Sequence, residues 1–391
     1  MTYLIILFLL CTALHMSAIK WMKCNITSPL SLTLFSWYSM AFVGMLSYDS
    51  FDSFRSATFY CLLTWILICS FAYAAMEMAQ PNKSKKYDSE PRRVCSKYSL
   101  LVIPACIITA YEIYKVGSNG PVNFLLNLRL ANIEEDYQYT TFTYMPMFYP
   151  IIMAMFASVC IHKSRLIEKV SICTWLIFFA LGTMGKFAVI TPILMFVTIY
   201  EMRYGIRKGK IFIYAPLVLA GIIVMHFYRM SSDDSATIPY ILGTYIYSPI
   251  IAFGTLVDNG INWNGEYTLR FIHAIAFKLG QSSSEPVKTI LDYVYVPSPT
   301  NVYSVMQPFY SDMGIYGIIL GAVIYGCFLS FVYASAKNGN FVMLGIYSIF
   351  SVSLITQFMS ETIITNLSGN IKIAIFMFII FKFFTKKQSN L

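Results

Sequence analysis

Eleven long apolar runs constrain this chain more than any other feature of its sequence. A helix needs about 20 mostly apolar residues to cross a bilayer, and the runs are close to that length. Only 12% of the residues are charged, against about 25% in soluble proteins. The sequence therefore predicts an all-α polytopic membrane protein of about 11 transmembrane helices (about 10–12), forming a single integral membrane domain over residues 1–391. The runs lie at residues 3–19, 29–48, 56–78, 98–116, 141–161, 170–184, 187–202, 211–228, 313–335, 341–358 and 370–385.

The basic residues predict the orientation of these helices. Of the 28 Lys and Arg residues, 19 lie in one alternating set of the gaps between runs. Loops rich in Lys and Arg stay in the cytoplasm, so the N-terminus is predicted outside and the C-terminus inside. The net charge of +9 is then loop charge that sets topology, and no nucleic-acid partner is expected.

One predicted outer segment is far longer than the others. Residues 229–310 lie between the eighth and ninth runs, whereas connections beyond about 15 residues are usually functional or disordered. Two stretches within it, 241–256 and 268–279, are apolar but short or interrupted by charges. We predict helices there that lie in the outer membrane interface, in a large periplasmic loop that acts as a binding or catalytic lid.

Three cations near the predicted outer helix ends are candidate ligands for a diphosphate. They are Arg129, Lys186 and Arg229. Charges at such positions are costly and often functional, and arginine and lysine suit phosphate oxygens. The alternatives are a solvated loop with a surface ion pair for Arg129, a snorkelling anchor for Lys186 and an ordinary helix-end arginine for Arg229.

Glu361 is the candidate catalytic residue. It is the only acid in the short outer turn before the last run, and Met359 and Ile363 flank it. Such a carboxylate could act as a general base on a sugar hydroxyl. The alternative is a helix-capping acid, and Asp312 and His273 are the next candidates for the base.

Aromatic and amide side chains gather at 292–314, where we expect glycan binding. Asn301, Tyr303 and Asp312 offer the ring faces and hydrogen-bonding groups that sugars require; the alternative is a Pro-stiffened loop that packs on the helices. The sequence holds no Cys or His spacing typical of a metal site, and neither a P-loop nor a dinucleotide-binding motif. We therefore expect no metal and no cofactor.

Four short stretches, taken in this order with the long loop, resemble the Wzy-type O-antigen (oligosaccharide repeat-unit) polymerases of Gram-negative bacteria. The resemblance also covers the length of the chain and the placement of its loops. The arginine–glycine motif of some members, with ten intervening residues, is not matched, because Gly280 follows Arg270 one residue too early. The four stretches are 182–190 (GTMGKFAVI), 247–253 (YSPIIAF), 299–303 (PTNVY) and 361–368 (ETIITNLS).

The resemblance implies a multi-pass protein of the bacterial inner membrane with its active face in the periplasm. It implies a helical bundle like those of lipid-linked-sugar (GT-C-like) glycosyltransferases. The activity implied is the joining of undecaprenyl-diphosphate-linked oligosaccharide repeat units into a long polysaccharide for lipopolysaccharide biosynthesis. Membrane lipids and a chain-length regulator protein are the implied partners.

Two other functions stay open. An O-antigen ligase, or another lipid-linked glycosyltransferase, has similar helices and a similar loop but a different acceptor. A flippase or exporter of lipid-linked sugars would need no chemistry. Transporters usually show internal repeats and mid-membrane charges, whereas the notable charges here lie at the predicted outer ends.

Overall fold

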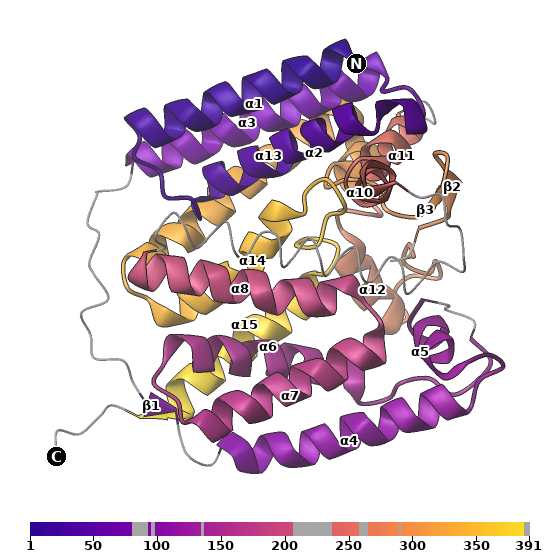
Figure 1. Ribbon diagram of the computed structural model, residues 1–391, viewed down its shortest axis with the longest axis vertical. Helices are drawn as coiled ribbons and strands as arrows, with labels where there is room; N and C mark the ends of the chain where they lie inside the picture. Colours follow the sequence, from indigo (N-terminus) through magenta and orange to yellow (C-terminus); the bar gives the residue numbers. More distant parts are fainter. Residues whose placement is uncertain are drawn as a thin grey trace. The chain divides into compact units, whose positions relative to one another are not determined.

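The computed structural model describes residues 1–79, 93–94, 98–133, 137–205, 237–257, 265–288 and 291–386. Within these residues there are fourteen α-helices and four strands of two residues each (Figure 1). The chain divides into two units, which we describe separately. Unit 1 comprises Met1–Lys83, His226–Ala334 and Phe350–Ser368, and unit 2 comprises Ser84–Met225, Ser335–Ile349 and Gly369–Leu391.

Unit 1 contains three long N-terminal helices, the helices within the predicted outer loop and most of the long helix that follows it. In Figure 1, α1, α2 and α3 run side by side. A two-stranded antiparallel ladder pairs Val294 with Thr300. The elements are α1 (Thr2–Trp21), α2 (Pro29–Leu46), the 3-10 turn η1 (Tyr48–Ser50), α3 (Ser56–Ala79), α10 (Ile238–Ile246), α11 (Ser248–Leu256), α12 (Arg270–Lys278), β2 (Val294–Tyr295), β3 (Pro299–Thr300) and α13 (Gln307–Lys337).

Unit 2 contains the middle helices and most of the C-terminal one. The strands β1 and β4 pair antiparallel, joining Val94 to Thr385. Helices α14 and α15 each have residues in both units. The elements are β1 (Arg93–Val94), α4 (Tyr98–Ser118), α5 (Phe124–Ile133), α6 (Met145–Ile161), α7 (Leu166–Thr183), α8 (Lys186–Tyr204), α14 (Phe341–Ile355), α15 (Leu367–Phe383) and β4 (Thr385–Lys386).

A buried glutamine joins the helices at the centre of unit 1. Gln357, just beyond α14, is fully buried. Its side-chain oxygen accepts hydrogen bonds from the indole nitrogens of Trp37 and Trp65, both at 3.0 Å. Its amide nitrogen donates to the hydroxyl of Thr33 at 2.9 Å. Its backbone oxygen accepts from the nitrogen of Val305 at 2.8 Å, so this residue also fixes the chain that leads into α13.

Two glycines shape α13. Gly314 has φ 57° and ψ −139°, so the helix is broken there into a short first part and a long second part. A Cβ on Gly326 would lie 2.3 Å from the Cβ of Ala72 in α3, well inside van der Waals contact. Gly326 therefore allows α3 and α13 to approach more closely than any larger residue would.

Buried carboxylates hold the starts of helices. In unit 2, Glu112 on α4 accepts hydrogen bonds from the backbone nitrogens of Thr143, Tyr144 and Met145 at 2.7–2.9 Å, where α6 begins. Glu168 accepts from the backbone nitrogen of Arg165 at 2.6 Å, at the N-terminus of α7. These bonds satisfy backbone donors that have no partner within the helix.

The helices agree closely with the apolar runs of the sequence. Ten of the eleven runs coincide with helices, and the run at 211–228 lies outside the described residues. The two helical stretches predicted within the long loop are confirmed as α10–α11 and α12, although their place in a membrane interface stays a prediction. Helix α5 is a difference, because the segment around Arg129 was expected to be a loop.

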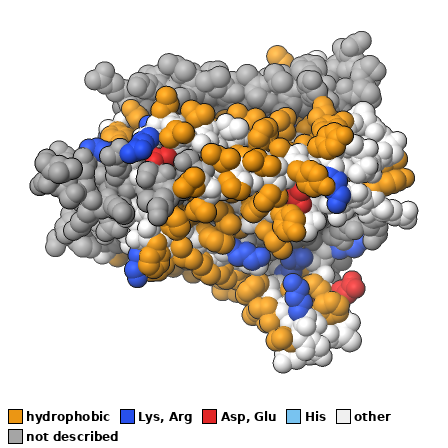
Figure 2. Space-filling model, turned by 90° about the horizontal axis from the view of Figure 1, so that it is seen from below, with side chains coloured by type: hydrophobic (Ala, Val, Ile, Leu, Met, Phe, Trp, Pro, Cys, Tyr) orange, Lys and Arg blue, Asp and Glu red, His pale blue; other side chains and the backbone are white. Residues whose placement is uncertain are grey.

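Seven helices of the described residues are long and apolar enough to cross a membrane. Their outer surfaces are apolar as well: Leu9 on α1, Phe71 on α3 and Phe331 on α13 are all exposed. Figure 2 shows hydrophobic side chains over much of the face in view, with few charges among them. The chain is thus a helical protein with the character of a polytopic membrane protein; the count of eleven and the orientation stay predictions.

Candidate functional site

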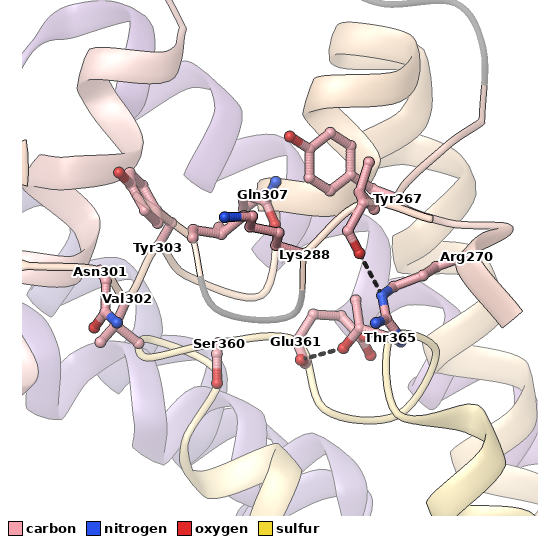
Figure 3. Close-up of a pocket in the computed structure, with 12 residues that line it drawn as sticks. Tyr267, Arg270, Lys288, Asn301, Val302, Tyr303, Gln307, Ser360, Glu361 and Thr365 are labelled. Atoms are coloured by element: carbon pink, nitrogen blue, oxygen red, sulfur yellow. Dashed lines mark hydrogen bonds between the residues drawn. The ribbon is translucent and has the colours of Figure 1, made fainter. Parts of the chain in front are cut away.

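A polar pocket lies within unit 1 and encloses about 500 Å³ of space, a figure that includes open solvent at its mouth. Three stretches of chain build it: the start of α12 with the segment that follows it, the segment between β3 and α13, and the turn before α15. Figure 3 shows their side chains around one cavity. The lining residues are Tyr267, Arg270, Val287, Lys288, Leu291, Asn301, Val302, Tyr303, Gln307, Ser360, Glu361 and Thr365.

Arg270 and Lys288 bring positive charge to the pocket. The Nε of Arg270 donates a hydrogen bond to the backbone oxygen of Val287 at 2.7 Å, which fixes the side chain at its base. Among the described residues, the two terminal guanidinium nitrogens make no further hydrogen bond. Figure 3 shows the guanidinium directed into the cavity, so its planar pair of donors can meet an anionic ligand.

Asp312 is not among the lining residues of the pocket. It is fully buried in the short first part of α13. Its carboxylate accepts from the backbone nitrogens of Tyr267 and Thr268, at 3.2 and 2.7 Å, and from the hydroxyl of Thr268 at 2.6 Å. Asp312 therefore positions Tyr267 and the beginning of α12; a direct contact with glycan is not part of this arrangement.

Glu361 lies in the lining and is buried, with 6% of its surface exposed. Oε1 accepts from the backbone nitrogens of Ile363 and Ile364 at 2.8 and 2.9 Å and from the hydroxyl of Tyr325. Oε2 accepts from the backbone nitrogens of Ile364 and Thr365 at 3.0 and 2.7 Å. Both oxygens are thus engaged in holding the turn, and acceptance of a proton requires one of these bonds to give way.

The same turn carries two hydroxyl groups of the lining. Thr365 donates its hydroxyl to the backbone oxygen of Glu361 at 2.7 Å, drawn as a dashed line in Figure 3. Ser360 lines the pocket and makes no side-chain hydrogen bond to the residues that the structure describes. Its hydroxyl is therefore available to a ligand.

Asn301 and Tyr303, both predicted to bind glycan, lie together in the lining. The amide of Asn301 has no hydrogen-bond partner within the described part of the chain. The hydroxyl of Tyr303 donates to the backbone oxygen of Asp292 at 2.8 Å. Burial, with the negative charge of Asp292, raises the pKa of Tyr303, so this hydroxyl remains a protonated donor.

Tyr267 faces them across the cavity in Figure 3. Burial raises its pKa, and the charges of Asp312, Glu266 and Asp292 add to the shift. Its hydroxyl thus remains protonated as well. Together Tyr267, Asn301 and Ser360 supply neutral polar groups of the kind that bind sugar hydroxyls.

None of the predicted diphosphate ligands is among the described lining residues of the pocket. Arg129 is in α5, and Lys186 is the first residue of α8, so both belong to unit 2. Arg229 lies outside the described residues. His273 is in α12, half-buried, and is not in the lining. The structure thus brings Glu361, Asn301 and Tyr303 together and leaves the three cations untested.

Several pocket residues were not assigned a role from the sequence, above all Arg270 and Lys288. The one signal for Arg270 was its place among apolar neighbours at 268–279. Within the described residues, no group of three or more His, Cys, Asp and Glu side chains is arranged to hold a metal. The pocket's polar character comes from its two cations, one carboxylate and neutral donors.

The helices and this pocket define the class: a helical protein of polytopic membrane character with a charged, amide-lined pocket in unit 1. Comparison with protein-family models, with curated proteins and with solved structures finds no match for this chain.

Proposed function

We propose that this chain is a membrane glycosyltransferase of the O-antigen polymerase type. It would transfer a growing glycan from undecaprenyl diphosphate to the non-reducing end of a new lipid-linked repeat unit, at the periplasmic face of the inner membrane. The choice of substrate follows from the sequence resemblance. The polar pocket supports a reaction on an anionic, sugar-bearing lipid.

The observation that carries the proposal is the pairing of two kinds of group in one pocket. Arg270 and Lys288 supply positive charge, while Asn301, Tyr267 and Ser360 supply neutral hydrogen-bonding groups. A lipid-linked glycan presents the matching pair, a diphosphate and a series of sugar hydroxyls. Arginine binds phosphate oxygens through two parallel bonds, and lysine acts as a point charge.

The proposed reaction requires a base for the acceptor hydroxyl and fixed cations for the leaving group. An acceptor hydroxyl attacks C1 of the donor sugar, a glycosidic bond forms, and the bond from C1 to the diphosphate oxygen breaks. The hydroxyl proton passes to a base, and the lipid diphosphate leaves with its negative charge. Fixed cations stabilise the charge that develops on this leaving group, which is the role proposed for Arg270 and Lys288.

Glu361 is the carboxylate of the lining, and it stays our candidate for the base. Its five hydrogen bonds also give it a second role, that of holding the 361–365 turn beneath the cavity. Arg129, Lys186 and Arg229 stay predicted ligands of a diphosphate. With Arg270 and Lys288 they are five of the nine cations predicted on the outer side.

Reconstitution tests the proposal. The purified full-length chain, in lipid vesicles that also contain lipid A–core, is incubated with a labelled undecaprenyl-diphosphate-linked repeat unit from the source strain. The expected product is a ladder of lipid-linked oligomers with release of undecaprenyl diphosphate. If the labelled unit is moved only to lipid A–core, the chain is a ligase; if it crosses the bilayer unchanged, the chain is a transporter. Either result would refute the proposal.

A further inference from the structure

Helix α12 and the two residues that cap it, Leu269 and Leu279, expose a continuous apolar face. The exposed fractions along this face are 49% for Leu269, 59% for Ile272, 43% for Ile275 and 67% for Leu279. Spacings of three and four residues place side chains on one side of a helix. A soluble protein rarely leaves such a row open to water.

The opposite side of α12 belongs to the pocket. Arg270 is half-buried there and is fixed through its Nε to Val287. Asp312 holds the residues immediately before the helix. One helix of nine residues therefore presents an apolar face outward and a wall of the pocket inward.

The charge of α12 is wholly positive. Arg270 and Lys278 are its charged residues, and it contains no Asp or Glu. Lys278 is exposed at the C-terminal end. Short amphipathic helices with an apolar face and basic residues bind at the boundary of headgroups and acyl chains, and basic residues favour anionic lipids there.

We propose that the face formed by Leu269, Ile272, Ile275 and Leu279 lies in the interface of an anionic lipid bilayer, so that α12 is a lipid-contacting wall of the pocket. The occupant is lipid because the same unit carries long helices with exposed apolar surfaces. The pocket then opens at the level of the headgroups. The lipid contact rests on the surfaces of α12 and of these long helices, and only its consequence for a lipid-linked substrate rests on the proposed function.

Site-specific photocrosslinking tests the contact directly. p-Benzoylphenylalanine replaces Ile272 or Leu279 in the full-length chain, which is reconstituted in vesicles of phosphatidylcholine and phosphatidylglycerol and irradiated. Leu320, exposed on α13, is the positive control. Ser283, exposed in the polar segment after α12, is the negative control. Mass spectrometry identifies the adducts.

The expected result is phospholipid adduct at 272 and 279 as at 320, with none at 283. Lys278→Gln is expected to lower the preference for phosphatidylglycerol adducts at 279 by about fivefold. Adduct at 320 without adduct at 272 and 279 would overturn the proposal, as would equal adduct at 283. Crosslinks from 272 to a second copy of the chain would assign the face to self-association instead. No glycan substrate is present, so this outcome is independent of the proposed function.

Discussion

The hydroxyl of Tyr325, midway along α13, donates a hydrogen bond to the carboxylate of Glu361, which lines the pocket. Both residues are buried. A long apolar helix is in this way joined to the turn that forms part of the pocket.

Tyr325→Phe should destabilise the protein, because it removes this donor and leaves the carboxylate with one bond fewer. Hydrogen bonds to charged groups contribute about 1.5–3 kcal/mol, so we expect a clear fall in the temperature of unfolding in detergent. Tyr316→Phe is the matched control, since Tyr316 lies on the same helix and is 69% exposed. Equal unfolding temperatures for the Tyr325→Phe variant and the unaltered chain would contradict the role given to this bond.

Glu361→Gln should abolish long glycan chains. As a base, Glu361 would contribute about 10²–10⁴-fold to the rate, and the amide of Gln cannot take a proton. The amide nitrogen also cannot accept from the backbone nitrogen of Thr365, so the turn is weakened as well. The lipopolysaccharide ladder and the unfolding temperature, measured together, separate the two roles.

If Glu361 is the base, the Gln variant loses far more polymerisation than its loss of folded protein explains, and Glu361→Asp keeps part of the activity. For a residue that only holds the turn, activity falls in proportion to folded protein. Normal chain lengths in the Gln variant would exclude Glu361 as the base.

Arg270→Ala should lower polymerisation by on the order of 10- to 100-fold, the loss expected for a hydrogen bond to a charged group. Arg270→Lys should recover part of it, because the charge remains while the paired geometry is lost. Arg165→Ala is the control, an exposed arginine outside the pocket. Unchanged product ladders with purified Arg270→Ala would remove this residue from the proposed site.

Gln357→Leu should destabilise the chain strongly. It leaves the indole nitrogens of Trp37 and Trp65 unbonded in a buried place, at about 1–3 kcal/mol for each unsatisfied group. In a background with both tryptophans replaced by phenylalanine, the same substitution should cost much less. If the substitution lowers the unfolding temperature equally in the two backgrounds, its cost does not come from the hydrogen bonds between Gln357 and the two tryptophans.

The apolar runs predicted most of the helices because a membrane span depends on composition over about 20 residues, which the sequence shows directly. Helix α5 was missed because it is short and contains Asn127, Arg129 and Asn132, which resemble a polar loop. The side-chain amides of two of these residues stabilise the structure. Asn127 donates a hydrogen bond to the backbone oxygen of Gly117, and Asn132 donates one to the backbone oxygen of Gly182. Such partners are invisible in a local pattern.

The pocket was predictable only in part. Glu361, Asn301 and Tyr303 stood out by residue type, yet what joins them to Arg270 is a tertiary arrangement of stretches about 90 residues apart in the sequence with no common local signal. Asp312 looked like a ligand for glycan because it follows an aromatic cluster. It is buried in the part of α13 before the break at Gly314 and accepts hydrogen bonds from the 267–268 backbone, and no periodicity reveals either feature.

The most direct measurement of the central claim is a lipopolysaccharide gel of a strain that lacks this chain, with and without the gene restored. If the chain is a polymerase, the strain that lacks it loses the long ladder and keeps a single repeat unit capped on core. Restoring the gene then brings the ladder back. Bare core would indicate a ligase or a transporter, and an unchanged ladder would separate the chain from O-antigen synthesis; either result would contradict the account.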